Sequence, residues 1–200
     1  MTLCFEHQIR KIGFLPYNLS PKTKIKMKYI FLDVDGVINC DTTEETINGW
    51  CFVEDRLIQI VRYIMDNTCA KVVLSSSWRS GYYGMKYGMD ESDESWGITE
   101  YQALVERCGQ NGVWFFSHTA WPESSDRGAE IHAWIEEQNE SEQKVYHVTS
   151  FVILDDYDMN ISSYFHDNFV KTNPAVGITI EDAEKAIEIL GKEKRKHACY

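Results

Sequence analysis

The chain has 200 residues, which is enough for one compact domain and short for two. Hydrophobic residues make up 44% of it and aromatic residues 13%, a composition that excludes a largely disordered chain. The net charge is −11, and residues 29–191 carry −19 because residues 1–28 carry +5 and residues 192–196 carry +3. A body this acidic argues against non-specific binding to a nucleic-acid backbone.

The six cysteines are scattered, with no C-x-x-C pair and no zinc-ligand spacing. They are expected to pack as small apolar side chains in a reducing compartment. No apolar run reaches the roughly 18 residues that a membrane helix needs, and the N-terminus lacks the apolar core of a secretory signal. We therefore expect a cytoplasmic protein that does not span a membrane, and nothing in the sequence indicates an obligate protein partner.

The chain divides into three predicted parts. Residues 1–26 are predicted to be an extension, because prolines interrupt them and their hydrophobic periodicity is poor. Residues 27–191 are predicted to form the folded domain, and residues 192–200 a basic tail. The two basic ends could contact an anionic partner, although solvated tails are the simpler interpretation.

From residue 28 onward, short apolar strands alternate with amphipathic helices. The predicted strands are 28–33, 70–74, 113–116, 151–154 and 169–172, and the predicted helices are 53–67, 99–108, 127–138 and 180–190. Residues 39–52 are predicted to be a polar loop, and residues 80–97, rich in Gly, Tyr, Ser and acids, a loop or small lid. This alternation predicts an α/β fold with a parallel sheet and helices on both faces.

Two of the helices carry clear terminal signals. Asp126 is a good N-cap for the helix 127–138. Thr179 is predicted to cap the helix 180–190, with Asp182 at the capping-box position and Gly191 just past the end.

Polar residues stand at the predicted strand ends. They are Asp33, Asp35, Ser75, Ser76, Asp155 and Asp156. In a parallel α/β sheet the ligand lies beyond the C-terminal ends of the strands, so these side chains are expected to share one site.

The first pair of acids suggests a cation. Asp33 and Asp35 are two residues apart in an extended segment, so both carboxylates can face one site, and Gly36 permits a sharp exit from the strand. Two adjacent carboxylates repel, which indicates a bound cation, such as Mg²⁺, or a division of acid and base roles. The alternatives are surface acids or a calcium loop, but residues 37–39 lack the further acids that an EF-hand loop needs.

The segment after the second strand is a candidate phosphate-binding loop. The hydroxyl of Ser75 or Ser76 and nearby backbone N–H groups could hold phosphate oxygens, although a plain serine turn is the alternative. Arg79 could pair with a phosphate. Trp78 could stack on a substrate or pack in the fold.

Further charged candidates lie later in the chain. Arg127 opposes the dipole at a helix N-terminus, so a role in neutralising a phosphate would explain its place, and Lys144 is the other candidate cation. One of Asp155 and Asp156 could complete a metal site while its neighbour orients a ligand. A surface charge and a solvated acidic turn are the simpler alternatives.

These four elements, in this order, resemble the haloacid-dehalogenase (HAD) superfamily of phosphatases. The stretches FLDVDGV, KVVLSSSWR, RGAEIHAWI and VILDD resemble the HAD domain of Swiss army knife RNA-repair proteins most closely. The resemblance covers residues 28–190. It implies a three-layer Rossmann-like core with a minimal cap domain or none, because the segment from Asp35 to Ser75 has no room for one and residues 80–120 could form only a partial lid.

The resemblance also implies a reaction. Asp33 would be the nucleophile that forms an aspartyl-phosphate, and Asp35 the general acid and base. Mg²⁺ would be held by the Asp33 carboxylate, the backbone carbonyl of Asp35, and Asp156 or Asp155. Ser75, or Ser76, and Arg127 would hold the phosphate oxygens.

The substrate is left open among several classes. An open site would admit the phosphate of a nucleotide or an RNA end, and the main alternative is a phosphoprotein phosphatase of the same fold. A phospho-receiver or a catalytically silent phosphate-binding module is the non-enzyme alternative. The presence of both Asp33 and Asp35 favours the enzyme.

Overall fold

A computed structural model describes residues 24–90, 96–120, 126–141 and 144–191. Most of the predicted extension and the whole basic tail therefore lie outside the described residues. The first strand begins at Ile25, three residues before the predicted strand, so the last two residues of the predicted extension belong to it.

The centre of the protein is a five-stranded parallel sheet. Its order is β5-β4-β1-β6-β7. The strands are β1 (Ile25–Leu32), β4 (Lys71–Leu74), β5 (Phe115–His118), β6 (Tyr146–Asp155) and β7 (Phe169–Lys171). Leu32 lies level with Leu74 of β4 and Leu154 of β6, so the three central strands end at the same edge.

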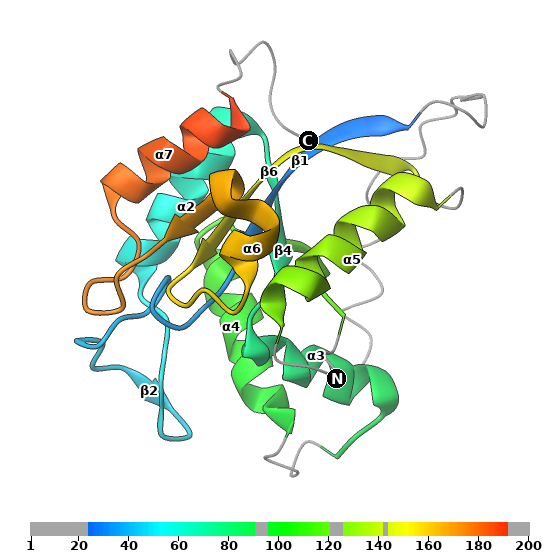
Figure 1. The fold of residues 1–200 in the computed structure, drawn as a ribbon. Helices are drawn as coiled ribbons and strands as arrows, with labels where there is room; N and C mark the ends of the chain where they lie inside the picture. The colour runs from blue at the N-terminus through cyan, green and yellow to red at the C-terminus, as the bar shows by residue number, and fades with distance from the viewer. Residues whose placement is uncertain (1–23, 91–95, 121–125, 142–143, 192–200) are drawn as a thin grey trace.

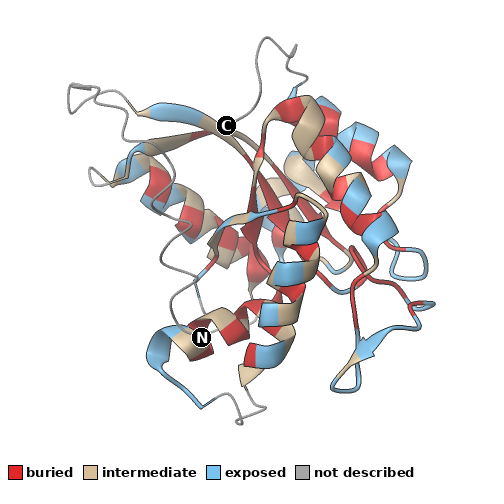
Figure 2. Ribbon diagram, turned by 180° about the vertical axis from the view of Figure 1, so that it is seen from behind, coloured by how far each residue is buried: buried red, intermediate tan, exposed pale blue. Residues whose placement is uncertain are grey.

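Helices cover both faces of this sheet (Figure 1). On one face lie α2 (Asp55–Thr68), α4 (Ile98–Gln110) and α7 (Ile180–Leu190), and on the other α5 (Arg127–Glu140) and α6 (Ile161–Phe165). Along β1, Ile30 and Leu32 pack into the α2 side while Tyr29 and Phe31 pack into the α5 side, as strand alternation requires. Figure 2 shows the buried residues concentrated in the strands between the helical layers. The predicted α/β class and three-layer core are confirmed.

The helix-terminal signals are also confirmed. Thr179 accepts a hydrogen bond from the Asp182 backbone N–H, and Asp182 completes the capping box of α7. Gly191 follows at the C-terminal end. The Asp126 side chain accepts a hydrogen bond from the backbone N–H of Ala129 at the start of α5.

The predicted loop at 80–97 is wrong in its first half. A short 3₁₀ turn, Ser77–Arg79, leads into α3 (Ser80–Tyr87), which packs against α4. The glycines suggested a loop, but they permit close helix packing: a Cβ on Gly81 would lie 2.4 Å from the carbonyl oxygen of Gly97. Residues 91–95 lie outside the described residues.

The predicted polar loop at 39–52 contains a small exposed hairpin, β2 (Thr46–Ile47) and β3 (Trp50–Cys51), visible in Figure 2. Asn48 and Gly49 both have positive φ at its turn. Asn-Gly between short strands is a strong hairpin signal, so the sequence contained the information that the loop prediction overlooked.

Strand boundaries differ in two further places. The fourth predicted strand is β6, which starts five residues earlier than expected. The predicted strand at 113–116 is β5, which starts two residues later, because Val113 closes the end of α4 through a hydrogen bond from its N–H to the Cys108 carbonyl. The C-terminal ends of these two strands lie within two residues of the predicted ends: β6 ends at Asp155 and β5 at His118.

The cysteines do not all behave as predicted. Cys40, Cys51 and Cys108 are free thiols, but Cys69, at the C-terminal end of α2, is disulfide-bonded. The expectation of unpaired cysteines is therefore wrong at Cys69. Within the described part of the chain, none of the helices combines the length and apolarity that crossing a membrane requires.

Candidate functional site

The candidate site residues lie at the C-terminal ends of the three central strands, along one edge of the sheet. Asp33 follows β1, Ser75 follows β4, and Asp155 is the last residue of β6. The Asp33 N–H donates to the Leu154 carbonyl and the Ser75 N–H to the Leu32 carbonyl, both at 2.9 Å. Sheet hydrogen bonding thus continues past the strand ends and fixes where these side chains begin.

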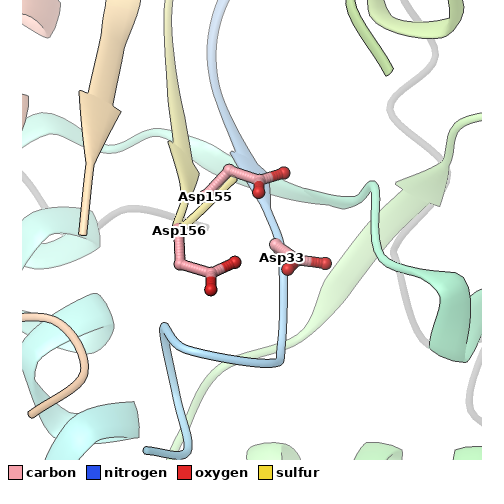
Figure 3. A group of neighbouring side chains, drawn as sticks. All are labelled: Asp33, Asp155 and Asp156. Atoms are coloured by element: carbon pink, nitrogen blue, oxygen red, sulfur yellow. The ribbon is translucent and has the colours of Figure 1, made fainter. Parts of the chain in front are cut away.

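Three carboxylates meet there. Asp33, Asp155 and Asp156 each offer an oxygen, and these oxygens lie within 4.8 Å of one another (Figure 3). Asp33 is 6% exposed and Asp155 1%. Burial, and secondly the charge of Asp33, raise the pKa of Asp155 well above its usual value, and the same two causes raise the pKa of Asp156. Two buried acids and one partly buried acid that repel one another in this way are suited to holding a cation.

One cation of the protein already contacts the cluster. Arg127, the first residue of α5, donates from Nη1 to Asp33 Oδ1 at 3.0 Å and to Asp155 Oδ2 at 2.8 Å. Burial alone would lower the pKa of Arg127, but the two carboxylates hold it above its usual value. Lys144 lies four residues past the far end of α5 and pairs with Glu137. The structure therefore places Arg127, and not Lys144, at this edge of the sheet.

Asp35 stands apart from the three-carboxylate cluster. Its Oδ1 accepts a hydrogen bond from Asn39 Nδ2 at 2.9 Å and its Oδ2 one from Trp78 Nε1 at 3.0 Å. Partial burial and the charge of Asp33 raise the pKa of Asp35, and the hydrogen bonds from Asn39 and Trp78 oppose this. The carboxylate is thus held in one orientation with a raised pKa, which suits a group that exchanges protons.

Asn39 is a site residue that the sequence analysis missed. Besides holding Asp35, it accepts a hydrogen bond from the Gly36 N–H at 2.9 Å and donates to the Cys51 carbonyl at 3.2 Å. Thr172, just after β7, donates to the Gly36 carbonyl at 2.8 Å. These two polar side chains fix the turn that carries Asp35, and the only sequence signal for Asn39 is its place six residues after Asp33 in an otherwise apolar stretch.

Gly36 is required by both backbone conformation and space. Its φ is +67°, and a Cβ there would lie 2.6 Å from Asp156 Cγ. We expect Gly36→Ala to lower the free energy of unfolding by about 1–2 kcal/mol from backbone strain, with a further loss from the clash. Because the clash displaces Asp156, the affinity for Mg²⁺ should fall as well, measured by titration calorimetry.

Gly88 supplies the matched control for this prediction. Its φ is +71°, but among the described residues, its chain neighbours and its own helix backbone apart, no atom lies within 4 Å of a Cβ built there. Gly88→Ala should show the strain alone, with unchanged Mg²⁺ affinity. Equal effects of the two substitutions on metal binding would contradict the role assigned to the contact between Gly36 and Asp156.

The phosphate-loop residues have mixed outcomes. Ser75 Oγ is buried and has no hydrogen-bond partner among the described residues, which marks it as able to take a ligand oxygen. Ser76 Oγ accepts a hydrogen bond from the Trp78 N–H.

The prediction that Arg79 pairs with a phosphate is wrong: Arg79 is 1% exposed and turns inward to Glu130. Trp78 contacts Asp35 and has its ring 6.3 Å from that of Phe52.

Comparison with known families agrees with this arrangement. Residues 29–183 match the sequence model of the HAD domain in Swiss Army Knife RNA repair proteins. The chain belongs to this family. The match includes all four elements of the site, from Asp33 to Asp156, and membership of this HAD family indicates a phosphatase-type hydrolase. A search of curated proteins finds no match.

Proposed function

We propose that this HAD domain is a Mg²⁺-dependent phosphomonoester hydrolase that acts through an aspartyl-phosphate on Asp33. The observation that carries the proposal is the cluster of Asp33, Asp155 and Asp156, the first two buried and the third partly buried, with Arg127 bridging Asp33 and Asp155. This combination gives a nucleophile, oxygen ligands for a hard cation, and a fixed positive charge at one edge of the sheet.

The roles of the protein groups follow from their positions. An oxygen of Asp33 attacks phosphorus, and the bond from phosphorus to the leaving oxygen breaks while Asp35 gives that oxygen a proton. In the second step a water attacks the phosphorus of the aspartyl-phosphate and gives a proton to Asp35. The bond between phosphorus and Asp33 breaks, so that inorganic phosphate is released and the Asp33 carboxylate is restored. The hydrogen bonds from Asn39 and Trp78 keep Asp35 oriented through both steps.

The donor set fits a hard cation, since it consists of carboxylate oxygens. Asp33 and Asp156, with the backbone carbonyl of Asp35, would hold Mg²⁺. Both oxygens of Asp155 already accept hydrogen bonds, from Arg127 and from the Tyr157 N–H, so Asp155 is assigned to orienting Arg127. The ion would shield the negative charge of nucleophile and phosphate from one another.

Two side chains are the main candidates for hydrogen-bond donors to the phosphate oxygens. The unpartnered Ser75 hydroxyl lies at the end of β4, next to β1, and Arg127 lies against Asp33 itself. Both would stabilise the charge that the phosphoryl group carries during transfer. Ser76 is a further candidate through its backbone N–H and its hydroxyl, because a hydroxyl that accepts a hydrogen bond from the Trp78 N–H can still donate its own proton.

The proposed substrate class is a nucleotide or RNA-end phosphate. The family is described from RNA repair proteins, and the segment between Asp35 and Ser75 holds only a small hairpin, α2 and β4. Nothing of domain size stands between the first two motifs, so the site has room for a bulky leaving group. A phosphoprotein phosphatase and a silent phosphate-binding module are the alternatives that the experiment must separate.

The test is hydrolysis of an aryl phosphate in Mg²⁺ and in EDTA, followed by nucleotides, RNA ends and phosphopeptides. We expect turnover in Mg²⁺ that EDTA removes, with a preference for nucleotide or RNA-end phosphates. A preference for phosphopeptides would instead indicate that phosphoproteins are the substrates. Absence of turnover from metal-loaded protein that still forms a beryllofluoride adduct on Asp33 would point to a more selective enzyme, and absence of both to a site that does not bind phosphate.

A further inference from the structure

Arg79 is the largest fully buried side chain of the described residues, and the proposed reaction does not use it. Its Nη1 donates to the carbonyl oxygens of Ser75 at 2.9 Å and Ser76 at 2.6 Å. Its Nε donates to the Ala120 carbonyl at 3.2 Å, and its Nη2 pairs with Glu130. One guanidinium thus connects the segment after β4, the segment after β5, and α5.

The pair of Arg79 and Glu130 is buried on both sides. The Arg79 side chain is 2% exposed and that of Glu130 9%. Burial lowers the pKa of Arg79 and raises that of Glu130, and each partner's charge opposes the shift of the other. A guanidinium stays charged under these conditions, so the pair is a fixed ionic contact and not a titrating switch.

On α5, Glu130 lies one helical turn from Arg127, on the same side of the helix. The negative charge of Glu130 helps to raise the pKa of Arg127. The positive charge of Arg127 in turn opposes the rise that burial causes in the pKa of Glu130. A single helical turn therefore carries both the cation that contacts Asp33 and the anion that holds Arg79. Any displacement of Arg79 relative to α5 would change the distance between the phosphate loop and Arg127.

The carbonyl contacts determine where the backbone N–H groups of the loop point. A trans peptide holds its C=O and N–H on opposite sides. With the Ser75 and Ser76 carbonyls turned to Arg79, the N–H groups of Ser76 and Ser77 turn away from it. Together with the Ser75 hydroxyl they form a set of donors of the kind that binds phosphate oxygens.

We propose that Arg79 and Glu130 are positioning residues, which hold the Ser75–Ser76 donors and Arg127 at the mutual distance that a phosphoryl group requires. The inference rests on the proposed function, because it assigns these donors to the phosphate. It predicts that loss of the pair weakens phosphate binding in a protein that is still folded. A purely structural ion pair would change stability alone.

The variants are Glu130→Gln, which keeps the shape and removes the charge, and the double variant Arg79→Met/Glu130→Met, which avoids a stranded buried charge. The readouts are the thermal midpoint, the dissociation constant for orthovanadate in Mg²⁺, and kcat and KM on an aryl phosphate. All binding is measured at a temperature where each variant is folded. Ile187→Ala, a fully buried residue of α7, is the control for lowered stability without a change at the site.

We expect both variants to bind orthovanadate at least about tenfold more weakly and to lose kcat by a similar factor, because small displacements of oriented groups are costly. Ile187→Ala should have a lower thermal midpoint and wild-type vanadate binding. Variants that behave like Ile187→Ala would overturn the inference while leaving the proposed function intact. Wild-type protein that neither binds vanadate nor hydrolyses the aryl phosphate would overturn both.

Discussion

Asp33→Asn should abolish Mg²⁺-dependent hydrolysis of an aryl phosphate, with a loss of kcat on the order of 10⁴-fold or more, as for other removed nucleophiles. The amide of asparagine has nearly the shape of the carboxylate but is a poor nucleophile. Asp33 is 6% exposed and within 3.0 Å of Arg127, so a substitution of similar size is needed to keep the surrounding contacts. Steady-state kinetics at saturating Mg²⁺ measure the effect.

Two controls accompany this experiment. Asp167→Asn removes a carboxylate that is 99% exposed and should leave kcat unchanged. Circular dichroism should show that Asp33→Asn keeps the native fold, because the substitution relieves repulsion with Asp155 and leaves Arg127 paired to Asp155. Turnover by Asp33→Asn close to that of the wild type would place the nucleophile elsewhere.

Arg127→Met should have the second-largest effect, on both stability and activity. It leaves Asp33 and Asp155 buried beside each other without their shared cation, and breaking a buried ion pair from one side costs about 3–5 kcal/mol. Urea denaturation in EDTA measures this loss. Activity should fall by about 10²–10³-fold, because a charged group that stabilises the transferring phosphoryl group is gone.

Mg²⁺ separates the two effects of Arg127→Met. Added Mg²⁺ should recover part of the stability, since on the proposed assignment it neutralises Asp33, one of the two carboxylates that Arg127 contacts. It should not recover the activity, since the contact to phosphate is still missing. Arg127→Lys should show smaller losses of both. Lys185→Met, at a side chain that is 66% exposed, should stay within about 0.5 kcal/mol of wild type. Unchanged stability of Arg127→Met in EDTA would show that Arg127 does not neutralise the cluster.

The parallel sheet and the capped helices were predictable because their signals are local. Thr179 and Asp182 are three residues apart and form the capping box, in which the side chain of each accepts a hydrogen bond from the backbone N–H of the other. The acids at strand ends were predictable for a related reason, since strand ends of a parallel sheet share an edge. Asp33 and Asp155 then meet because β1 and β6 are neighbours, which the sequence analysis did not predict. The family match supports the same arrangement.

The errors share a different cause, which is that they depend on tertiary contacts. Gly81 looked like a loop residue, yet it permits the close approach of α3 to Gly97. Arg79 looked like a phosphate ligand, because sequence does not show whether a long cationic side chain turns toward solvent or toward a buried glutamate. The sequence signal for Asn39 was weak, since its function consists of holding Asp35 and Gly36 in place.

The central place of β1 in the sheet has a consequence for how the protein folds. β1 pairs with both β4 and β6, and Asp33 meets Arg127, which lies 94 residues further along the chain. No local segment can assemble these groups, so the site forms only when the long loops that bring β1, β6 and α5 together have closed. Such contacts slow folding, and they make the appearance of the site coincide with cooperative formation of the whole sheet. A truncated or nascent chain that ends before β6 would therefore lack the site altogether.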